Sequence, residues 1–163
     1  MSEIYWGDSP VIRASQGGSG ELVFRDGETF YKITNYHTMP AFFVTVVSGS
    51  DHWMYLSSSG GLTCGRGNSD NALFPYYTDD KIHDAHSTTG PKTVLLVGRG
   101  DKTFLWKPFE SGLSVYALER NLYKNLTGNK LIFEEFNHSL GLVFSYGWSN
   151  SDRFGFVRNA TLA

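Results

Sequence analysis

The alternation of large and small side chains in the segment "LGLVFSYGW" (140–148) constrains the fold of this chain more than any other feature. Every second position holds a large apolar or aromatic residue, and these positions are Leu140, Leu142, Phe144, Tyr146 and Trp148. A period of two residues is typical of a β-strand with one buried face. The runs "LIFEEF" (131–136) and "RFGFV" (153–157) flank this segment across the turn-forming sequences "NHS" and "SNSD". Three consecutive antiparallel strands are therefore predicted.

Similar short runs recur along the chain, at 21–24, 29–34, 41–48 and 52–58, and "KTVLLVGRGDKTFLWKP" (92–108) reads as strand, turn, strand. "FFVTVV" (42–47) is apolar on both faces, which predicts a central strand covered on two sides. "LSVYALERNLYKNL" (113–126) has apolar residues at helical spacing, but its neighbours favour a strand. No helix of about ten residues or more is predicted. We therefore expect an all-β antiparallel sandwich of about ten to twelve strands, with little or no helix, in one domain (1–163).

Composition narrows the function classes. The 163 residues suit a single domain with its own core. The net charge is −2 and no run of lysine and arginine occurs, so no nucleic acid partner is expected. No signal peptide pattern opens the chain, and no apolar stretch approaches the ~20 residues of a membrane helix, so we expect a cytoplasmic location and no membrane partner. The single cysteine, Cys64, excludes an internal disulfide and is expected to be a small buried residue.

The segment "DDKIHDAH" (79–86) gathers Asp79, Asp80, His83, Asp84 and His86 within eight residues. Carboxylates and imidazoles bind divalent metals, but the same residue types are typical of a solvated loop. On a strand the two histidines would face opposite sides of the sheet. We therefore expect no metal site here, and no cofactor elsewhere.

Other reactive patterns also have structural interpretations. "GRGD" (98–101) contains an adhesion tripeptide, but it lies between two strand-like runs and is interpreted as a hairpin turn. Glu134 and Glu135 are adjacent, so on a strand they point to opposite faces and cannot flank one glycosidic bond. No Gly-X-Ser-X-Gly sequence is present. No catalytic residue is assigned to this chain.

The aromatic residues are the more suggestive feature, because they make up 15% of the chain. Aromatic rings build β-sandwich cores, and Trp148 and Trp106 are expected to be buried. Exposed rings can instead stack on the apolar faces of sugars. Trp53 and the pair Tyr76–Tyr77 flank a glycine-rich loop, where exposure is more plausible.

The stretch "WMYLSSSGGLTCGRGNSDNALFPYYTDD" (53–80) resembles the N-terminal β-sandwich domain of glycoside phosphorylases of the glycosyltransferase-36 group (glycoside hydrolase family 94, the cellobiose and chitobiose phosphorylase type). Those domains carry a strand ending in Ser or Asn, then Gly-Gly, a short loop and an aromatic-Asp exit. The matching positions are Ser58, Gly60, Gly61, Pro75, Tyr76, Tyr77 and Asp79. The segments 120–148 and 154–162 resemble neighbouring strands of that domain. Where the family has basic residues after the Gly-Gly loop, this chain has "ALFPYY".

The resemblance implies part of a galactose-mutarotase-like supersandwich, an N-terminal fragment of a larger enzyme whose chemistry lies in a downstream (α/α)6 catalytic domain. The implied role is non-catalytic: packing, dimerisation and part of a site for an oligo- or disaccharide, shaped by the Gly-Gly loop. The carbohydrate-binding candidates are Trp53, Arg66, Tyr76, Tyr77 and Asp79. Exposed strand edges further predict a homo-oligomer.

Two other functions stay open. An aldose-epimerase-like sugar enzyme would need a histidine base and a carboxylate in one cleft, drawn from His52, His83 or His138 with Glu119 or Glu135. The other alternative is a free-standing carbohydrate-binding or adhesion module.

Overall fold

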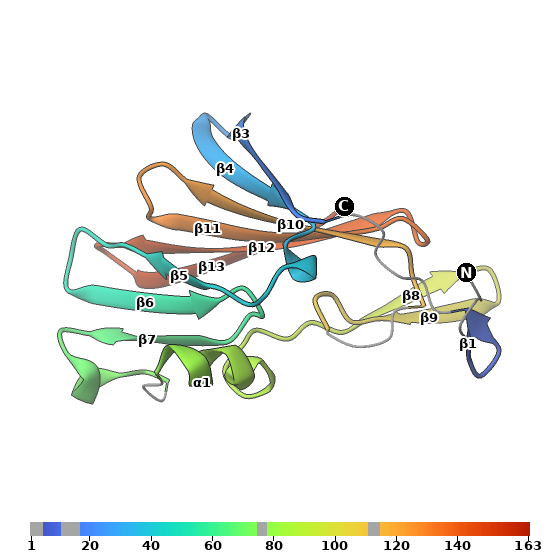
Figure 1. Ribbon diagram of the computed structural model, residues 1–163, viewed down its shortest axis with the longest axis horizontal. Coiled ribbons are helices and arrows are strands. Elements are labelled where there is room, and N and C mark those ends of the chain that lie inside the picture. Colours follow the sequence, from blue (N-terminus) through green and yellow to red (C-terminus); the bar gives the residue numbers. More distant parts are fainter. Residues whose placement is uncertain (1–4, 11–16, 75–77, 111–114) are drawn as a thin grey trace.

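The computed structural model describes residues 5–10, 17–74, 78–110 and 115–163. Its architecture is all-β and antiparallel, as the alternation predicted (Figure 1). The large sheet has six strands in the order β13-β12-β11-β10-β4-β3. Their bounds are β3 Ser19–Arg25, β4 Glu28–Thr34, β10 Leu118–Asn125, β11 Lys130–Asn137, β12 Leu142–Ser151 and β13 Gly155–Leu162. The consecutive antiparallel strands β11, β12 and β13 and the strand assignment of β10 are thereby confirmed.

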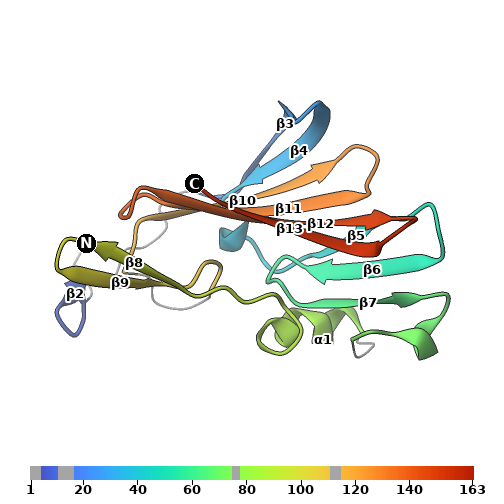
Figure 2. The same cartoon turned by 180° about the vertical axis from the view of Figure 1, so that it is seen from behind.

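A second layer lies against one face of the large sheet, as both views show (Figures 1 and 2). It consists of the small sheet β5-β6-β7, with bounds Phe43–Val46, His52–Ser57 and Leu62–Arg66, and of the hairpin β8-β9, with bounds Leu95–Arg99 and Lys102–Trp106. The short helix α1, Asp79–Asp84, follows the small sheet and lies on its far side (Figure 2). The remaining short elements are β1 Tyr5–Trp6, β2 Ser9–Pro10, η1 Tyr36–Thr38, η2 Ser69–Asn71 and η3 Ala85–Ser87.

The turns follow their sequence signals. Asp26 and Gly27 both have positive φ, 51° and 82°, and form the two-residue turn between β3 and β4. In "GRGD", Gly100 has a φ of 62° in the turn between β8 and β9, which confirms that the segment is a hairpin turn.

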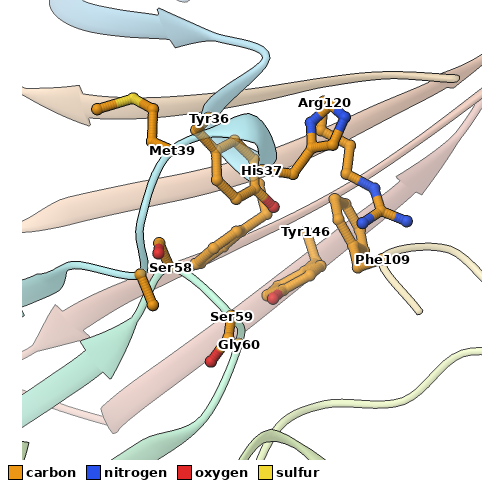
Figure 3. Close-up of a pocket in the computed structure, with 11 residues that line it drawn as sticks. Tyr36, His37, Met39, Ser58, Ser59, Gly60, Phe109, Arg120 and Tyr146 are labelled. Atoms are coloured by element: carbon orange, nitrogen blue, oxygen red, sulfur yellow. The ribbon is translucent and has the colours of Figure 1, made fainter. Parts of the chain in front are cut away.

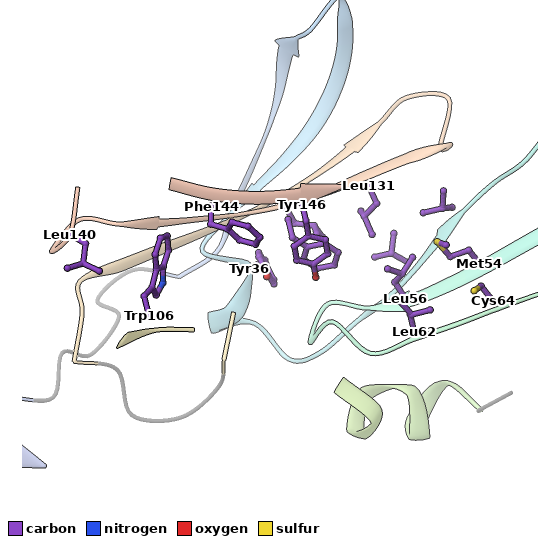
Figure 4. Close-up of a cluster of buried hydrophobic side chains, with 14 residues drawn as sticks. Tyr36, Met54, Leu56, Leu62, Cys64, Trp106, Leu131, Leu140, Phe144 and Tyr146 are labelled. Carbon is purple, nitrogen blue, oxygen red and sulfur yellow. The ribbon is translucent and has the colours of Figure 1, made fainter. Parts of the chain in front are cut away.

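The core lies between the two layers (Figure 4). The large residues of the alternating segment all point into it: Leu140, Phe144 and Tyr146 are buried, and Leu142 and Trp148 pack against them. Trp106 is only 1% exposed and lies in the core as expected, whereas Trp148 is partly buried and packs against the core. Cys64 is buried on the small sheet, and burial raises the pKa of its thiol to about 11, so it packs there as a neutral apolar group.

Three features differ from the sequence expectation. The segment containing β5 was expected to be a central strand, but β5 is the edge of the small sheet and Phe43 is 41% exposed. The segment "LTCGR" was not recognised as a strand and forms β7. The acidic segment 79–86 was treated as loop or strand and contains α1 and η3. In the ranges that the structure describes, no helix has both the length and the apolar surface needed to cross a membrane.

One face of the hairpin β3-β4 is left uncovered, because the large sheet extends beyond the small one (Figure 1). Leu22 pairs with Tyr31 across the hairpin, and Phe24 lies two residues further along the same face. Their exposed fractions are 63%, 47% and 77%, respectively. This apolar surface continues into a groove of about 580 Å³ beside β5.

Candidate functional site

The Ser-Gly-Gly turn that stands out in the sequence connects β6 to β7 and points toward the large sheet. The amide of Gly60 donates to the Ser57 carbonyl at 2.9 Å, and the Ser57 amide donates to the Gly61 carbonyl at 2.8 Å. Gly60 has a φ of 98°, a conformation that side chains rarely adopt. The turn is therefore rigidly hydrogen-bonded, and it presents Ser59 and the Gly60 backbone to a cavity.

That cavity, here called the aromatic lobe, has a volume of about 160 Å³ and lies between the turn and the inner face of the large sheet (Figure 3). Rings and polar groups both line it. The lining residues are Tyr36, His37, Met39, Ala41, Ser58, Ser59, Gly60, Phe109, Arg120, Phe133 and Tyr146.

A second cavity of about 260 Å³, here called the lysine lobe, adjoins the first. The two lobes share Ser59, Gly60, Phe109 and Tyr146, so they form one two-part cleft. The lysine lobe is completed by the segment before β8 and the segment after β9, and its further lining residues are His86, Ser87, Gly90, Pro91, Lys92, Thr93, Val94, Lys107, Pro108 and Glu110. Drug-sized ligands occupy cavities of roughly 300–1,000 Å³, so each lobe suits a smaller molecule.

Tyr146 is the centre of the aromatic lobe. Its ring stacks on Phe133 with centroids 4.9 Å apart, and Phe109 approaches it edge-on at 5.2 Å. The guanidinium of Arg158 lies over the same ring at 4.9 Å. Burial raises the pKa values of the Tyr146 and Tyr36 hydroxyls, so both are neutral hydrogen-bond donors at physiological pH.

Phe109, at the junction of the lobes, has a left-handed backbone with a φ of 65°. A bulky residue in this region is an outlier that costs about 1–3 kcal/mol and persists only when its surroundings hold it. The holding group is Glu135, whose side chain is fully buried. Its carboxylate accepts hydrogen bonds from the Phe109 amide at 2.8 Å and from the Trp106 Nε1 at 2.7 Å. Strained backbone of this kind clusters at binding sites, which singles out the 107–110 segment.

Arg120 completes this network. Its Nε donates to Glu135 at 2.6 Å, and its Nη2 donates to the Glu110 carbonyl at 2.8 Å. The guanidinium therefore braces the 107–110 segment from the large sheet while lining the aromatic lobe. Glu134 projects to the other face of the sheet, where it accepts from Tyr123 and Arg25, and this confirms that the two glutamates diverge.

His37 lines the aromatic lobe from the short helix η1. Burial lowers the pKa of His37 below its usual value of 6.5, and the Arg120 charge acts in the same direction, while Glu135 opposes it. At neutral pH the ring is therefore uncharged.

We expect His37 to make folding sensitive to mild acid. As pH falls through about 6.5, the unfolded chain takes up a proton that the folded chain resists, so stability is lost below that pH and is complete above it. Urea unfolding at about pH 7.5 and about pH 5.5 should show a larger loss for the wild type than for His37→Asn. Equal losses in the two proteins would contradict this assignment.

The structure places the five sequence candidates away from the cleft or leaves them undescribed. Tyr76 and Tyr77 lie outside the described residues, and of Asp79 only the backbone, at the start of α1, is described. Arg66, at the end of β7, pairs with Asp51 at 3.0 Å on the surface. Trp53 lies opposite Gly65 on the outer face of the small sheet. Neither Trp53 nor Arg66 lines the cleft.

Trp53 has a packing role in this position. Its indole covers the Gly65 backbone so closely that a Cβ on Gly65 would lie 2.3 Å from the ring. Tyr55 lies against it with centroids 5.7 Å apart, and Phe43 stacks on Tyr55 at 5.3 Å. Sequence reasoning instead missed Tyr36, His37, Phe109, Arg120 and Tyr146, which are distant in sequence and carry no local motif.

The pairs that an epimerase would need are not placed together in the cleft. His138 lies 3.9 Å from Glu119, but both side chains are on the surface and neither lines the lobes. His83 hydrogen-bonds Ser57 at 2.6 Å, and His52 hydrogen-bonds Ser50 at 2.7 Å. Among the described residues, no cluster of three or more histidine, cysteine or acidic side chains is placed to hold a metal ion. The cleft is thus equipped for binding by rings, hydroxyls and cations.

No protein-family model matches this chain, and a search of curated proteins found no match.

Proposed function

We propose that this domain is a non-catalytic carbohydrate-binding β-sandwich and that the two-lobed cleft at Ser59–Gly60 holds the sugar. The observation that carries the proposal is the pairing of the strained Phe109 with polar side chains, among them Arg120 and Ser59, in one cleft. Sugars present apolar C–H faces and a rim of hydroxyls, so they need both kinds of partner. The size of each lobe favours one sugar ring per lobe, and hence a disaccharide.

The residues that line the cleft suit a binding role rather than a catalytic one. Among the described residues of the cleft, the one carboxylate is Glu110, which is exposed and paired with Lys107 at 3.3 Å. Glycoside chemistry needs two carboxylates across the bond that is broken. We infer that the reaction belongs to a separate catalytic domain, such as the (α/α)6 barrel of the phosphorylases that the sequence resembles, with this domain contributing part of the sugar site.

Isothermal titration with cello-, chito- and glucobiose tests the proposal. We expect at least one of these disaccharides to bind, and Phe109→Ala to weaken its binding by about tenfold or more, because central aromatic contacts dominate such sites. The matched control is Arg66→Ala, an exposed residue outside the cleft, which should bind as the wild type does. If Arg66→Ala weakens binding while Phe109→Ala leaves it unchanged, the sugar lies elsewhere.

The uncovered face of β3-β4 supports a second role, self-association. β3 is an edge strand of seven residues, and it carries the exposed Leu22 and Phe24. Edge strands pair readily with a second copy, and a two-fold axis would join two β3 strands into one continuous sheet. The occupant that we propose for this surface is therefore another molecule of the same chain.

Sedimentation velocity measures this directly. We expect the wild type to form a dimer at micromolar concentration and Phe24→Glu to weaken it at least about tenfold, since a buried charge opposes packing. Phe154→Glu is the control, because Phe154 is equally exposed, at 71%, but lies in the turn between β12 and β13. A wild type that stays monomeric at high concentration would rule out this dimer.

A further inference from the structure

The lysine lobe differs in charge from the rest of the chain. The chain as a whole has a net charge of −2. Two lysines, Lys92 and Lys107, line the lobe against a single acidic residue, Glu110. A concave surface with an excess of cations focuses a positive potential and attracts an anion.

The two lysines are held differently. Lys107 is paired with Glu110, three residues along the chain, at 3.3 Å. Within the described part of the chain, Lys92 forms no ion pair. It lies shortly before β8, and Lys107 follows β9 directly; because Leu95 pairs with Trp106, both lysines line the lobe from the same end of this hairpin. An acidic group entering the lobe would thus meet one uncompensated ammonium and compete with Glu110 for the other.

Hydroxyl donors surround the same space. Ser87 and Thr93 line the lobe, and hydroxyls donate to phosphate and carboxylate oxygens as readily as they bond sugar hydroxyls. Ser59 also lines it, but its hydroxyl already donates to the His83 carbonyl at 2.9 Å. The loop that carries Ser59 and the loop that carries Ser87 approach each other closely at Gly90. A Cβ on Gly90 would lie 2.6 Å from the Gly60 carbonyl oxygen, so only glycine fits there. The two loops that form the lobe are therefore packed backbone to backbone.

We propose that the ligand of the cleft is an acidic sugar, with its phosphate or carboxylate held between Lys92 and Lys107 in the lysine lobe and its ring in the aromatic lobe. This inference rests on the proposed function and adds the chemical class of the ligand. Arg120 is excluded as the anchor of the acid group, because its guanidinium is already bound by the buried Glu135.

The test compares sugars that differ only in the acid group: glucose with glucose 6-phosphate, glucose with glucuronate, and cellobiose with its 6-phosphate. We expect the acidic member of at least one pair to bind about tenfold more tightly or better, which corresponds to about 1.4 kcal/mol. The gain should vanish in Lys92→Gln and shrink in Lys107→Gln. It should also decrease between about 20 mM and about 500 mM salt, because salt screens partly exposed charges.

Two further variants sharpen the result. Glu110→Gln removes the competing carboxylate and should strengthen binding of the acidic sugar by about threefold, because it frees the Lys107 ammonium from its surface ion pair. Lys102→Gln is the control, since Lys102 is an exposed lysine at the start of β9, outside the cleft.

The outcomes separate the two claims. If neutral and acidic sugars bind equally well and Lys92→Gln has no effect, the inference is overturned while the proposed function stands. If no sugar of either kind binds, the proposed function fails, and inorganic phosphate then decides the inference. Phosphate-induced shifts of the Gly60 and Gly90 amides that disappear in Lys92→Gln would support an anion site. Their absence would overturn it.

Discussion

Replacing Glu135 by alanine is expected to cost about 3–5 kcal/mol of stability, the usual penalty for breaking a buried ion pair from one side. The substitution leaves the Trp106 indole and the Phe109 amide without their acceptor, and it leaves the Arg120 charge, 12% exposed, without a partner. For a chain of this length the melting temperature should fall by about 10 °C or more. Thermal unfolding followed by circular dichroism gives the value.

Two comparisons identify the cause. Glu110→Ala removes an exposed glutamate from the same neighbourhood and should change stability by less than about 1 kcal/mol. The double substitution Glu135→Leu with Arg120→Met replaces the ion pair by apolar groups and should recover part of the loss, because a buried pair is often no more stabilising than well-packed apolar residues. A Glu135→Ala protein as stable as the wild type would show that the carboxylate does not hold the strained segment at Phe109.

The second large effect is expected for Gly61→Ala. A Cβ at this position would lie 2.2 Å from the Ile82 carbonyl oxygen and 3.1 Å from the His86 amide nitrogen. Both atoms are backbone, so α1 and η3 would have to move away from the Ser-Gly-Gly turn. Overpacking of this kind costs about 1–3 kcal/mol, and here it also displaces Ser59 and Gly60 from the cleft.

The matched control is Gly98→Ala, in β8, where a Cβ meets nothing within 4 Å. It should change stability by no more than about 0.5 kcal/mol, as surface substitutions generally do. Urea unfolding of the three proteins measures the difference. A Gly61→Ala protein with wild-type stability and wild-type sugar binding would mean that α1 is not packed on the turn as described.

The strands of the large sheet could be predicted from the sequence because each carries its own signal. The alternation in β12 and the Asp-Gly turn between β3 and β4 depend only on neighbouring residues. The position of β5 could not be predicted in this way. Its apolar residues look like those of a central strand, but only the tertiary arrangement decides that the strand forms an edge. β7 was missed because glycine, threonine and cysteine give it no clear pattern.

The candidate site was predictable only in part. The Ser-Gly-Gly turn was recognised from the sequence, and it does line the cleft. Its partners come from η1, from the segment after β9 and from β10, β11 and β12. Nothing in the sequence around Phe109 signals a left-handed backbone, because that conformation is imposed by Glu135 from a strand more than twenty residues away. Trp53 was chosen for its ring, whose role is set by packing over Gly65.

The most direct test of the central claim is an amide NMR titration of the intact chain with cellobiose and with its 6-phosphate. If the sugar is held in the two-lobed cleft, the shifted resonances will be those of Gly60, Gly90 and Phe109, while those of Gly98 and Lys102, at the turn end of the β8-β9 hairpin and outside the cleft lining, stay unchanged. No shifts at saturating sugar, or shifts confined to the outer face of the small sheet around Trp53 and Arg66, would contradict it.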